Sequence, residues 1–462
     1  MKKTLTFRVG LMSLLGMMGL LLSFGLALAQ SERTSDIVIK ILGTERPRIA
    51  LPDLRGTGAA LDLMPVLNQT LYADVEMSGV FRMQPKSMYP LQVPQRREDF
   101  RRPEGNRHGN GLYLRDWSQP PVEANWLAVG YAAEQNGRLA LYGYLYNVNE
   151  PDLANAEVFG KMYYGSLDDA GARAVAHEFA NDILKQFGSR TLAGTRVFFV
   201  SNRTGNDEIW SMNFDGTEQK QFTHLRAITL MPTISPDGSL LAFTTFAEGT
   251  PAIRIHSADT QQRKPFVNPV ASMNATPEIT SDNGQILFSS TADGKSTQIY
   301  VAGINGAGLR RLTYSGSVEV SPRVNPKTGA DILFVSGRGG TPQIYKMNID
   351  GANVERLTAG EGEAHNPAWN PDGETMAFAW SRGYEPGNFN IFIMDTISRQ
   401  YTQLTYGSGR NENPWWSPDG RRLVFSSSRN GGTQIWTMLA DGTQVQQLTT
   451  SGRNRMPVWS VK

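Results

Sequence analysis

The sequence contains no cysteine among its 462 residues. This absence excludes a disulfide framework, a thiol nucleophile, an iron–sulfur cluster and a zinc site with cysteine ligands. The chain also lacks a strong charge of either sign, because 45 Lys and Arg residues stand against 43 Asp and Glu residues. So balanced a charge gives no field that would hold nucleic acid, which disfavours a nucleic-acid partner. What the sequence does contain is turn formers, 46 Gly and 25 Pro residues, and these are typical of a turn-rich β protein.

The first 29 residues have the pattern of a secretory signal peptide. They begin with three basic residues, continue as an apolar run from Val9 through Leu28, and end in Ala27-Leu28-Ala29, a sequence that signal peptidase cleaves. We therefore expect cleavage after Ala29 and export of the mature chain. The alternative is a retained membrane anchor, because the run approaches the ~20 residues that a membrane span needs. No later stretch is apolar enough to span a bilayer, so no span is expected after processing.

The second half of the chain repeats one short motif six times, and such repeats define an architecture. The fullest form is Pro-x-x-Ser-Pro-Asp-Gly, and successive copies start 45, 45, 45, 47 and 43 residues apart. The copies begin at Pro232, Pro277, Pro322, Pro367, Pro414 and, in shortened form, Pro457. Each of the first five is followed by an apolar strand, a strand of the Gln-Ile-Tyr type and a short Leu-Thr strand. Four strands in about 45 residues predict one blade of a β-propeller.

Turn residues and the order of the repeats support this division into blades. Asp-Gly or Asn-Gly pairs between the third and fourth strands predict tight two-residue hairpins, because such turns need a positive φ. These pairs are Asp215-Gly216, Asn305-Gly306, Asp350-Gly351 and Asp441-Gly442. The first repeat, which begins at Arg196, has no motif before it, whereas Met456–Ser460 stands alone at the other end. We therefore expect Met456–Ser460 to supply the innermost strand of the first blade, which closes six blades into a ring without an open sheet edge.

Residues 30–193 have a different texture and predict a small α/β domain. The expected elements are strands at Ile37–Ile41 and Arg48–Leu51, a helix at Leu61–Ser78, and a hairpin of Trp126–Ala133 and Leu139–Asn147 around Asn136-Gly137. A second helix is expected to be capped by Ser166 and ended by Gly188. An arginine-rich insert, residues 92–110, is expected to be a surface loop. The expected fold class is mainly β, with a six-bladed propeller over residues 194–462 preceded by this domain.

Motifs that carry enzyme chemistry are absent or incomplete. The chain has no Gly-x-Ser-x-Gly elbow, and its five histidines are too scattered to predict a three-histidine metal site. We therefore expect no catalytic, cofactor-binding or metal-binding residues. The alternative is a propeller that binds carbohydrate, or a lyase or hydrolase with an unrecognised site in the channel. Strand alternation turns only one of Trp415 and Trp416 toward the channel, so at most one could stack on a sugar.

The leader, the α/β domain and the six repeats together resemble the TolB family, the periplasmic propeller proteins of the Tol-Pal system. The specific features are the six repeats in this order, the segment Arg46–Asp53 and the strand end and helix over Tyr163–Phe187. The resemblance covers essentially the whole mature chain. It implies a periplasmic, non-enzymatic adaptor that links TolA to the lipoprotein Pal and supports outer-membrane integrity and invagination during cell division.

The resemblance also implies where the two partners bind. TolA is expected at the N-terminal segment, which includes Ile37, Val38 and Ile39, and Pal at the mouth of the propeller channel. The residues favour the same mouth, because the loops before the repeated prolines converge there and propellers bind ligands at such mouths. The expected partner-binding residues of these loops are Met273, Asn274, Glu319, His365, Asn366, Arg410, Asn411, Glu412 and Arg453. His365 is the best single candidate, with a purely structural role as the alternative, and Met273 stands where the family often has histidine.

Overall fold

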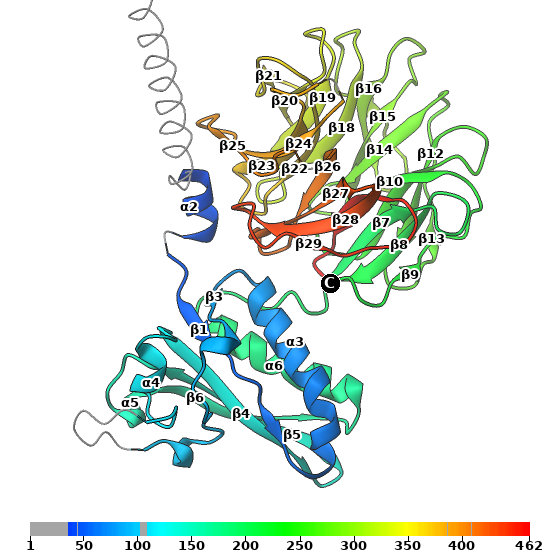
Figure 1. Ribbon diagram of the computed structural model, residues 1–462. Helices are drawn as coiled ribbons and strands as arrows, with labels where there is room; N and C mark the ends of the chain where they lie inside the picture. Colours follow the sequence, from blue (N-terminus) through cyan, green and yellow to red (C-terminus); the bar gives the residue numbers. More distant parts are fainter. Residues whose placement is uncertain (1–35, 44, 102–108, 386, 408) are drawn as a thin grey trace, which may run out of the picture.

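The protein consists of a β-propeller and a smaller α/β domain that lies beside one face of the propeller (Figure 1). The computed structural model describes residues 36–43, 45–101, 109–385, 387–407 and 409–462. The expected signal peptide and part of the arginine-rich insert lie outside these ranges. Six four-stranded sheets form the propeller and one six-stranded sheet forms the centre of the α/β domain, which confirms the expected fold class.

Each blade is a four-stranded antiparallel sheet, and its strands follow one another outward from the central channel. Blade 1 contains β30 (Asn454–Trp459), β7 (Arg196–Ser201), β8 (Glu208–Asn213) and β9 (Lys220–Gln221); blade 2 contains β10 (Thr229–Ile234), β11 (Leu240–Thr245), β12 (Ala252–Ser257) and β13 (Arg263–Lys264); blade 3 contains β14 (Asn274–Ile279), β15 (Gln285–Ser290), β16 (Gln298–Gly303) and β17 (Arg310–Arg311). Blade 4 contains β18 (Glu319–Val324), β19 (Asp331–Ser336), β20 (Gln343–Asn348) and β21 (Glu355–Arg356); blade 5 contains β22 (Ala364–Trp369), β23 (Thr375–Trp380), β24 (Asn390–Asp395) and β25 (Tyr401–Gln403); blade 6 contains β26 (Asn411–Trp416), β27 (Arg422–Asn430), β28 (Gly432–Leu439) and β29 (Gln446–Gln447).

The last strand of the chain completes the first blade. β30 pairs antiparallel with β7, with Asn454 opposite Ser201 and Trp459 opposite Val197. The side chain of Trp459 is buried, and its indole N–H donates a hydrogen bond of 2.9 Å to Thr195 Oγ1. The expected closure of the ring is therefore confirmed.

The connection between the third and fourth strands is longer than the expected two-residue hairpin. In blade 1 it spans residues 214–219, and of the Asp215-Gly216 pair only Gly216 has a positive φ, 88°. The carboxylate of Asp215 instead accepts hydrogen bonds from the backbone N–H and the hydroxyl of Thr217, at 3.0 and 2.6 Å. The predicted tight turn is confirmed in the positive φ of Gly216 but contains three residues instead of two, because the Asn213 N–H donates to the Thr217 oxygen and the Gly216 N–H to the Asn213 oxygen, both at 2.9 Å.

The α/β domain is built on a mixed sheet with strand order β3-β1-β4-β5-β6, and β2 also pairs with β4. Its strands are β1 (Arg48–Ala50), β2 (Arg55–Gly56), β3 (Arg82–Met83), β4 (Trp126–Gln135), β5 (Arg138–Asn147) and β6 (Glu157–Gly165). Its helices are the 3₁₀ helices η1 (Gly58–Leu63), η2 (Lys86–Met88) and η3 (Arg97–Asp99) and the α-helices α3 (Met64–Met77), α4 (Arg115–Ser118), α5 (Leu153–Ala156) and α6 (Asp169–Lys185). The predicted hairpin is confirmed, because Asn136 and Gly137 turn β4 into β5 with φ of 54° and 72°.

Helices α3 and α6 cover one face of this sheet and form the core of the domain with it. Apolar side chains such as Leu71 of α3 and Phe179 of α6 are buried against the sheet. The predicted cap of α6 is wrong by two residues. Asp168 is the N-cap and accepts the backbone N–H of Gly171 at 2.8 Å, whereas the hydroxyl of Ser166 donates to the Asp168 carboxylate.

The segment predicted as a strand at Ile37–Ile41 is instead an α-helix, α2 (Asp36–Leu42). The run of β-branched residues favours a strand locally, but Ile37, Val38 and Leu42 lie on one face of a helix. This face is buried against blades 5 and 6 of the propeller. Burial of that face outweighs the local preference, so the strand prediction is wrong for a tertiary reason.

The α/β domain and the propeller contact each other at the C-terminal end of α3. The guanidinium of Arg421 in blade 6 donates to the backbone oxygens of Ser78 and Gly79, at 3.2 and 2.8 Å. Its neighbour Arg422 is fully buried and donates to the Met77 oxygen and to Gln444 Oε1. Burial lowers the pKa of Arg422 to about 10, so the group stays positive at neutral pH. These two guanidinium groups therefore donate hydrogen bonds to backbone carbonyls at the C-terminal end of α3, where the helix dipole is negative.

Candidate interaction surfaces of the propeller

The propeller has two faces, which differ in what covers them. The mouth face is the one at which the innermost strands begin, and the turn face carries the Ser-Pro-Asp-Gly turns that follow these strands. Gly238 and Gly420 of these turns have positive φ values of 74° and 70°. Arg421, which contacts the α/β domain, follows one of the turns, so the domain lies on the turn face.

At the mouth face each innermost strand contains the same backbone irregularity. The residue before the repeated proline has a positive φ in all six blades, and the register of the strand shifts there. These residues are Met231, Thr276, Ser321, Asn366, Asn413 and Met456, with φ between 50° and 56°. Only asparagine favours this conformation, so the other four positions are strained, and such strain is typical of functional regions.

The six irregular positions form a ring around a small cavity. All six line a cavity of about 80 Å³ at the mouth of the channel, together with prolines of the repeats. Proline is tolerated in these strands because their inner side faces the channel and offers no ladder partner. The sequence predicted loops before the prolines, but most of these residues belong to the strands, since each strand begins three residues before its proline.

Three of the expected mouth residues are buried and hold the blades. Asn274 accepts the hydroxyl of Ser290 at 2.7 Å, and Asn411 accepts the guanidinium of Arg429 at 3.1 Å. Glu319, with no exposed surface, accepts the guanidinium of Arg338 at 3.1 Å. These side chains offer no surface to a partner in this arrangement.

The other expected mouth residues lie at the surface of this face, and several form ion pairs. His365 Nε2 lies 3.2 Å from a carboxylate oxygen of Glu363, and its ring packs edge-on against Phe389. Arg410 pairs with Glu412 at 2.6 Å, and Arg453 lies 3.7 Å from Asp207. Met273 and Asn366 are half-buried. The rim is therefore polar, with both signs of charge interspersed.

Exposed apolar side chains on the same face were not predicted from the sequence. They occur in the segments that precede innermost strands or follow second strands, and all of these segments lie at the mouth face. They are Ile228, Phe246, Val270, Tyr314, Val318 and Tyr406, of which Val270 is 98% exposed. Their signal in the sequence was weak, because each is a single apolar residue in a polar loop. A polar rim with exposed apolar and tyrosine side chains is typical of a protein-binding surface.

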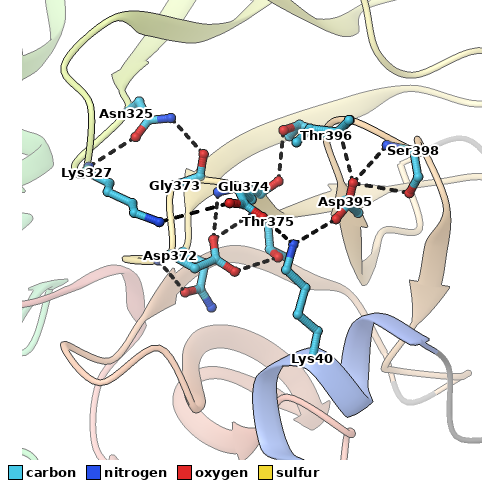
Figure 2. Close-up of polar contacts among 12 residues, drawn as sticks. Lys40, Asn325, Lys327, Asp372, Gly373, Glu374, Thr375, Asp395, Thr396 and Ser398 are labelled. Atoms are coloured by element: carbon cyan, nitrogen blue, oxygen red, sulfur yellow. Dashed lines mark hydrogen bonds and ion pairs between the residues drawn. The ribbon is translucent and has the colours of Figure 1, made fainter.

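The second expected contact, the N-terminal segment, lies on the turn face. Lys40 of α2 donates to Glu374 at 2.6 Å and to Asp395 at 3.1 Å, and both acids belong to blade 5 (Figure 2). The hydrogen bond with Glu374 is the main reason why the pKa of Lys40 is raised. Ile37 and Val38 are buried against the propeller, and Ile39 is half-buried. The structure therefore separates the two expected contacts, with the mouth at one end of the channel and α2 at the other.

The described residues contain no group of three or more His, Asp or Glu side chains that could hold a metal ion. Within the same ranges no helix is long and apolar enough to cross a membrane. Trp416 is buried between blades, whereas Trp415 lines the channel, as strand alternation predicts. The face of the Trp415 ring is covered by the guanidinium of Arg323, 4.7 Å from its centroid.

These features define a class: a six-bladed β-propeller with an α/β domain and an N-terminal helix on its turn face, and with a mouth face that neither of them covers in the described part of the chain. A family model described as the TolB beta propeller domain matches residues 185–379 and 359–462. The chain belongs to the TolB family.

Relatives and a solved structure agree with this assignment. A TolB homolog of Chlorobium chlorochromatii is 35% identical over 194 residues, which span 42% of each chain. The Tol-Pal system protein TolB of Anaeromyxobacter dehalogenans (strain 2CP-1) is 30% identical over 310 residues, which span 66% of each chain. The chain thus matches less than half the length of the first of these relatives. The crystal structure of TolB from Acinetobacter baumannii has the same fold, with a TM-score of 0.71 at 20% identity over 90% of this chain and 97% of that one.

Proposed function

We propose that this protein is a periplasmic, non-enzymatic adaptor of the Tol-Pal system, which links TolA to the lipoprotein Pal. In that role it would support outer-membrane integrity and invagination during cell division. The observation that carries the proposal is membership of the TolB family, whose relatives include Tol-Pal system proteins. An adaptor needs two separate contact surfaces, and the mouth face and α2 lie at opposite ends of the channel.

The mouth face is the proposed contact for Pal. Its apolar side chains can be buried by a partner, while the charged rim around Arg410 and Arg453 can select that partner by complementary charge. His365 lies on the same rim and can donate or accept a hydrogen bond. Asn274, Glu319 and Asn411 support this surface from beneath and are not proposed as direct contacts.

The segment that begins with α2 is the proposed contact for TolA. Because Ile37 and Val38 are buried against the propeller, a partner that binds them must first displace α2. The helix is short, and within the described residues its ion pairs are those of Lys40, which are partly exposed to solvent. Release of the helix would also expose the buried side chains of Ile37, Val38 and Leu42, so TolA must bury a comparable apolar surface to displace it.

The test is direct binding to purified Pal and to the purified periplasmic part of TolA from the same organism. The triple substitution His365→Ala, Arg410→Ala and Arg453→Ala should weaken binding of Pal by about tenfold or more, because hot spots cluster on such surfaces. Binding of TolA should not change. A melting curve of the variant checks that the propeller remains folded.

A matched control is Lys264→Ala, which removes an exposed cation from the outermost strand of blade 2, away from the mouth. It should leave both affinities unchanged. If the purified chain binds neither Pal nor TolA, the proposed adaptor role is wrong. If Pal binds the triple variant as tightly as the parent chain, its contact lies elsewhere.

A further inference from the structure

The channel of the propeller is obstructed at the level just inside the repeated prolines. The residue after the proline differs in every blade, so this level is asymmetric although the backbone is repeated. Going round from blade 1 to blade 6, the residues are Val458, Thr233, Glu278, Arg323, Ala368 and Trp415. One half of this ring is therefore polar, with a single acid beside a single base, and the other half is apolar.

Arg323 of blade 4 spans the channel and contacts three other blades. Its Nη1 donates to Glu278 in blade 3 at 2.7 Å and lies 3.4 Å from the hydroxyl of Thr233 in blade 2. Its guanidinium also lies over the Trp415 ring of blade 6, on the opposite side. Thr233 donates to Glu278 as well, at 2.8 Å. These contacts divide the channel into two chambers, because Arg323 and Trp415 line both.

The two chambers differ in size and lining. The mouth chamber holds about 80 Å³, whereas the chamber on the turn face holds about 250 Å³. The residues that line the larger one include Trp369, Trp415, Trp416 and Trp459 and prolines of the turns. Of these tryptophans, Trp415 faces the channel, and the rings of the other three are largely buried between blades. An apolar cavity of about 150 Å³ is enough to bind benzene, so this chamber has room for an aromatic ring and a short polar arm.

The guanidinium of Arg323 lies at the inner end of this chamber, and part of its hydrogen-bonding capacity is unused. Its Nε is buried and has no partner among the described residues. Its Nη2 makes no hydrogen bond to the described part of the chain either, since both hydrogen bonds of the guanidinium come from Nη1. Nε and Nη2 form one edge of the guanidinium fork, which matches the two oxygens of a carboxylate.

We propose that the larger chamber is a binding site for a small carboxylate with a compact aromatic or branched apolar body. The carboxylate would accept hydrogen bonds from the free edge of Arg323, and the apolar body would lie beside Trp415 and the prolines of the turns. Glu278 opposes this binding, because its negative charge already partly neutralises Arg323. Removal of that charge should therefore strengthen binding, whereas removal of Arg323 should abolish it.

The probe is phenylacetate, with phenylacetamide as the uncharged molecule of the same shape and acetate as the carboxylate without an aromatic body. Titration calorimetry and ligand-observed NMR on the full chain measure the affinities. We expect phenylacetate to bind, and phenylacetamide and acetate to bind at least tenfold more weakly. Glycyl-phenylalanine distinguishes the source of the carboxylate: it should bind as well as phenylacetate if the natural ligand is a chain terminus, and less well if it is a free small molecule.

The decisive variants change affinity in opposite directions. Glu278→Gln keeps a group that can accept the Thr233 hydroxyl but loses the charge, so it should bind phenylacetate severalfold more tightly. The double variant Arg323→Met, Glu278→Gln removes the anion-binding edge without leaving a buried unpaired carboxylate, so it should lose binding. Arg323→Lys keeps the charge but not the fork and should bind at least tenfold more weakly.

The matched control is Arg338→Met, Glu319→Gln. This pair also joins a buried glutamate to an arginine that lies over aromatic rings, and it also belongs to blade 4, but neither residue lines a chamber. It should bind phenylacetate like the parent chain. The proposal is overturned if the parent chain does not bind phenylacetate, if phenylacetamide binds equally well, or if the Arg323 double variant, shown to be folded by its melting curve, keeps its affinity.

Discussion

The mouth face and the turn face of the propeller are built by different means. The mouth face depends on the backbone, since one strained bulge before a proline recurs in every blade whatever the residue, as Met231 and Thr276 illustrate. The turn face depends on particular side chains, because Arg421 and Arg422 hold the α/β domain and Lys40 holds α2. A repeated backbone leaves the side chains of the mouth free to vary, whereas the turn face is committed to contacts within the chain. Within the described residues, the mouth is the face that the α/β domain and α2 leave exposed.

The largest expected effect comes from a change that breaks both faces together. A chain that ends at Gly452 lacks β30, so β7 loses its inner neighbour and the ring cannot close. Val458 and Trp459 are buried, and each contributes roughly 1.5–3 kcal/mol, so about 3–6 kcal/mol is lost before ladder hydrogen bonds are counted. We expect an insoluble chain or a much lower melting temperature. A chain that ends at Ser460 keeps β30 and should melt like the full chain; equal melting of the two truncations would mean that β30 does not hold the ring.

The next effect should be confined to the turn face. Arg422→Met removes the bonds of a fully buried guanidinium to Met77 and Gln444, and the unpaired oxygens should cost about 2 kcal/mol of unfolding free energy. Small-angle scattering should also detect a larger radius of gyration, because the two domains are held together less tightly. Arg429→Met, in the same blade but bonded to Asn411 at the mouth end, is the control: it should leave the scattering curve unchanged. A compact Arg422 variant would show that the joint rests on other contacts.

A smaller effect tests the strain at the mouth face. Met231 has a φ of 54°, and two other blades already carry asparagine at this position, Asn366 and Asn413. Asparagine tolerates this conformation better than methionine, so Met231→Asn should be neutral or stabilise the protein by about 0.5 kcal/mol. Leu230→Asn places the same residue one position earlier, where an apolar side chain packs on a core, and should destabilise by about 1 kcal/mol. Denaturant titration measures the change in the free energy of unfolding for both variants. If both substitutions destabilise the protein, position 231 is not strained.

The smallest effect concerns α2 and pH. The pKa of Lys40 is raised, so its contribution is present below about pH 10.5 and is lost as the pH rises through the folded value. The pKa of Asp395 is lowered although burial alone would raise it, so its contribution is present above about pH 4 and is lost as the pH falls. The protection factors for hydrogen exchange at residues 37–42 should therefore fall at both extremes of pH. Lys40→Met should abolish the change at alkaline pH and lower the free energy of unfolding by less than about 1 kcal/mol, because the ion pair is partly exposed. If the change at alkaline pH persists in this variant, another group causes it.

The blades could be predicted from the sequence because each depends on short-range signals. Period, turn residues and apolar strands lie within about 45 residues, and the unpaired motif at Pro457 indicates how the ring closes. The helix α2 could not be predicted, because its apolar face is explained only by blades 5 and 6, which lie more than 300 residues away. Strained φ values such as that of Met231 leave no residue-type signal when the position is not glycine or asparagine.

The sequence predicted which residues lie at the mouth of the channel but not how they are arranged there. The repeated prolines mark the mouth, yet they do not indicate that Asn274 and Asn411 are buried while Arg410 and Arg453 are exposed. That distinction depends on the alternation of side chains around a bulge, which shifts the register by one residue. The obstruction by Arg323 was missed although its signal is readable: the residue after each proline differs between blades, and one blade has an acid where the next has a base.

The pairing of β30 with β7 has a consequence for the order in which the protein folds. The two strands are separated by about 250 residues, so the contact that completes blade 1 is the most distant along the propeller and forms slowly. Until β30 pairs, β7 carries an unpaired inner edge. Closure of the ring is therefore a late step of folding, and this edge is exposed to aggregation until it happens.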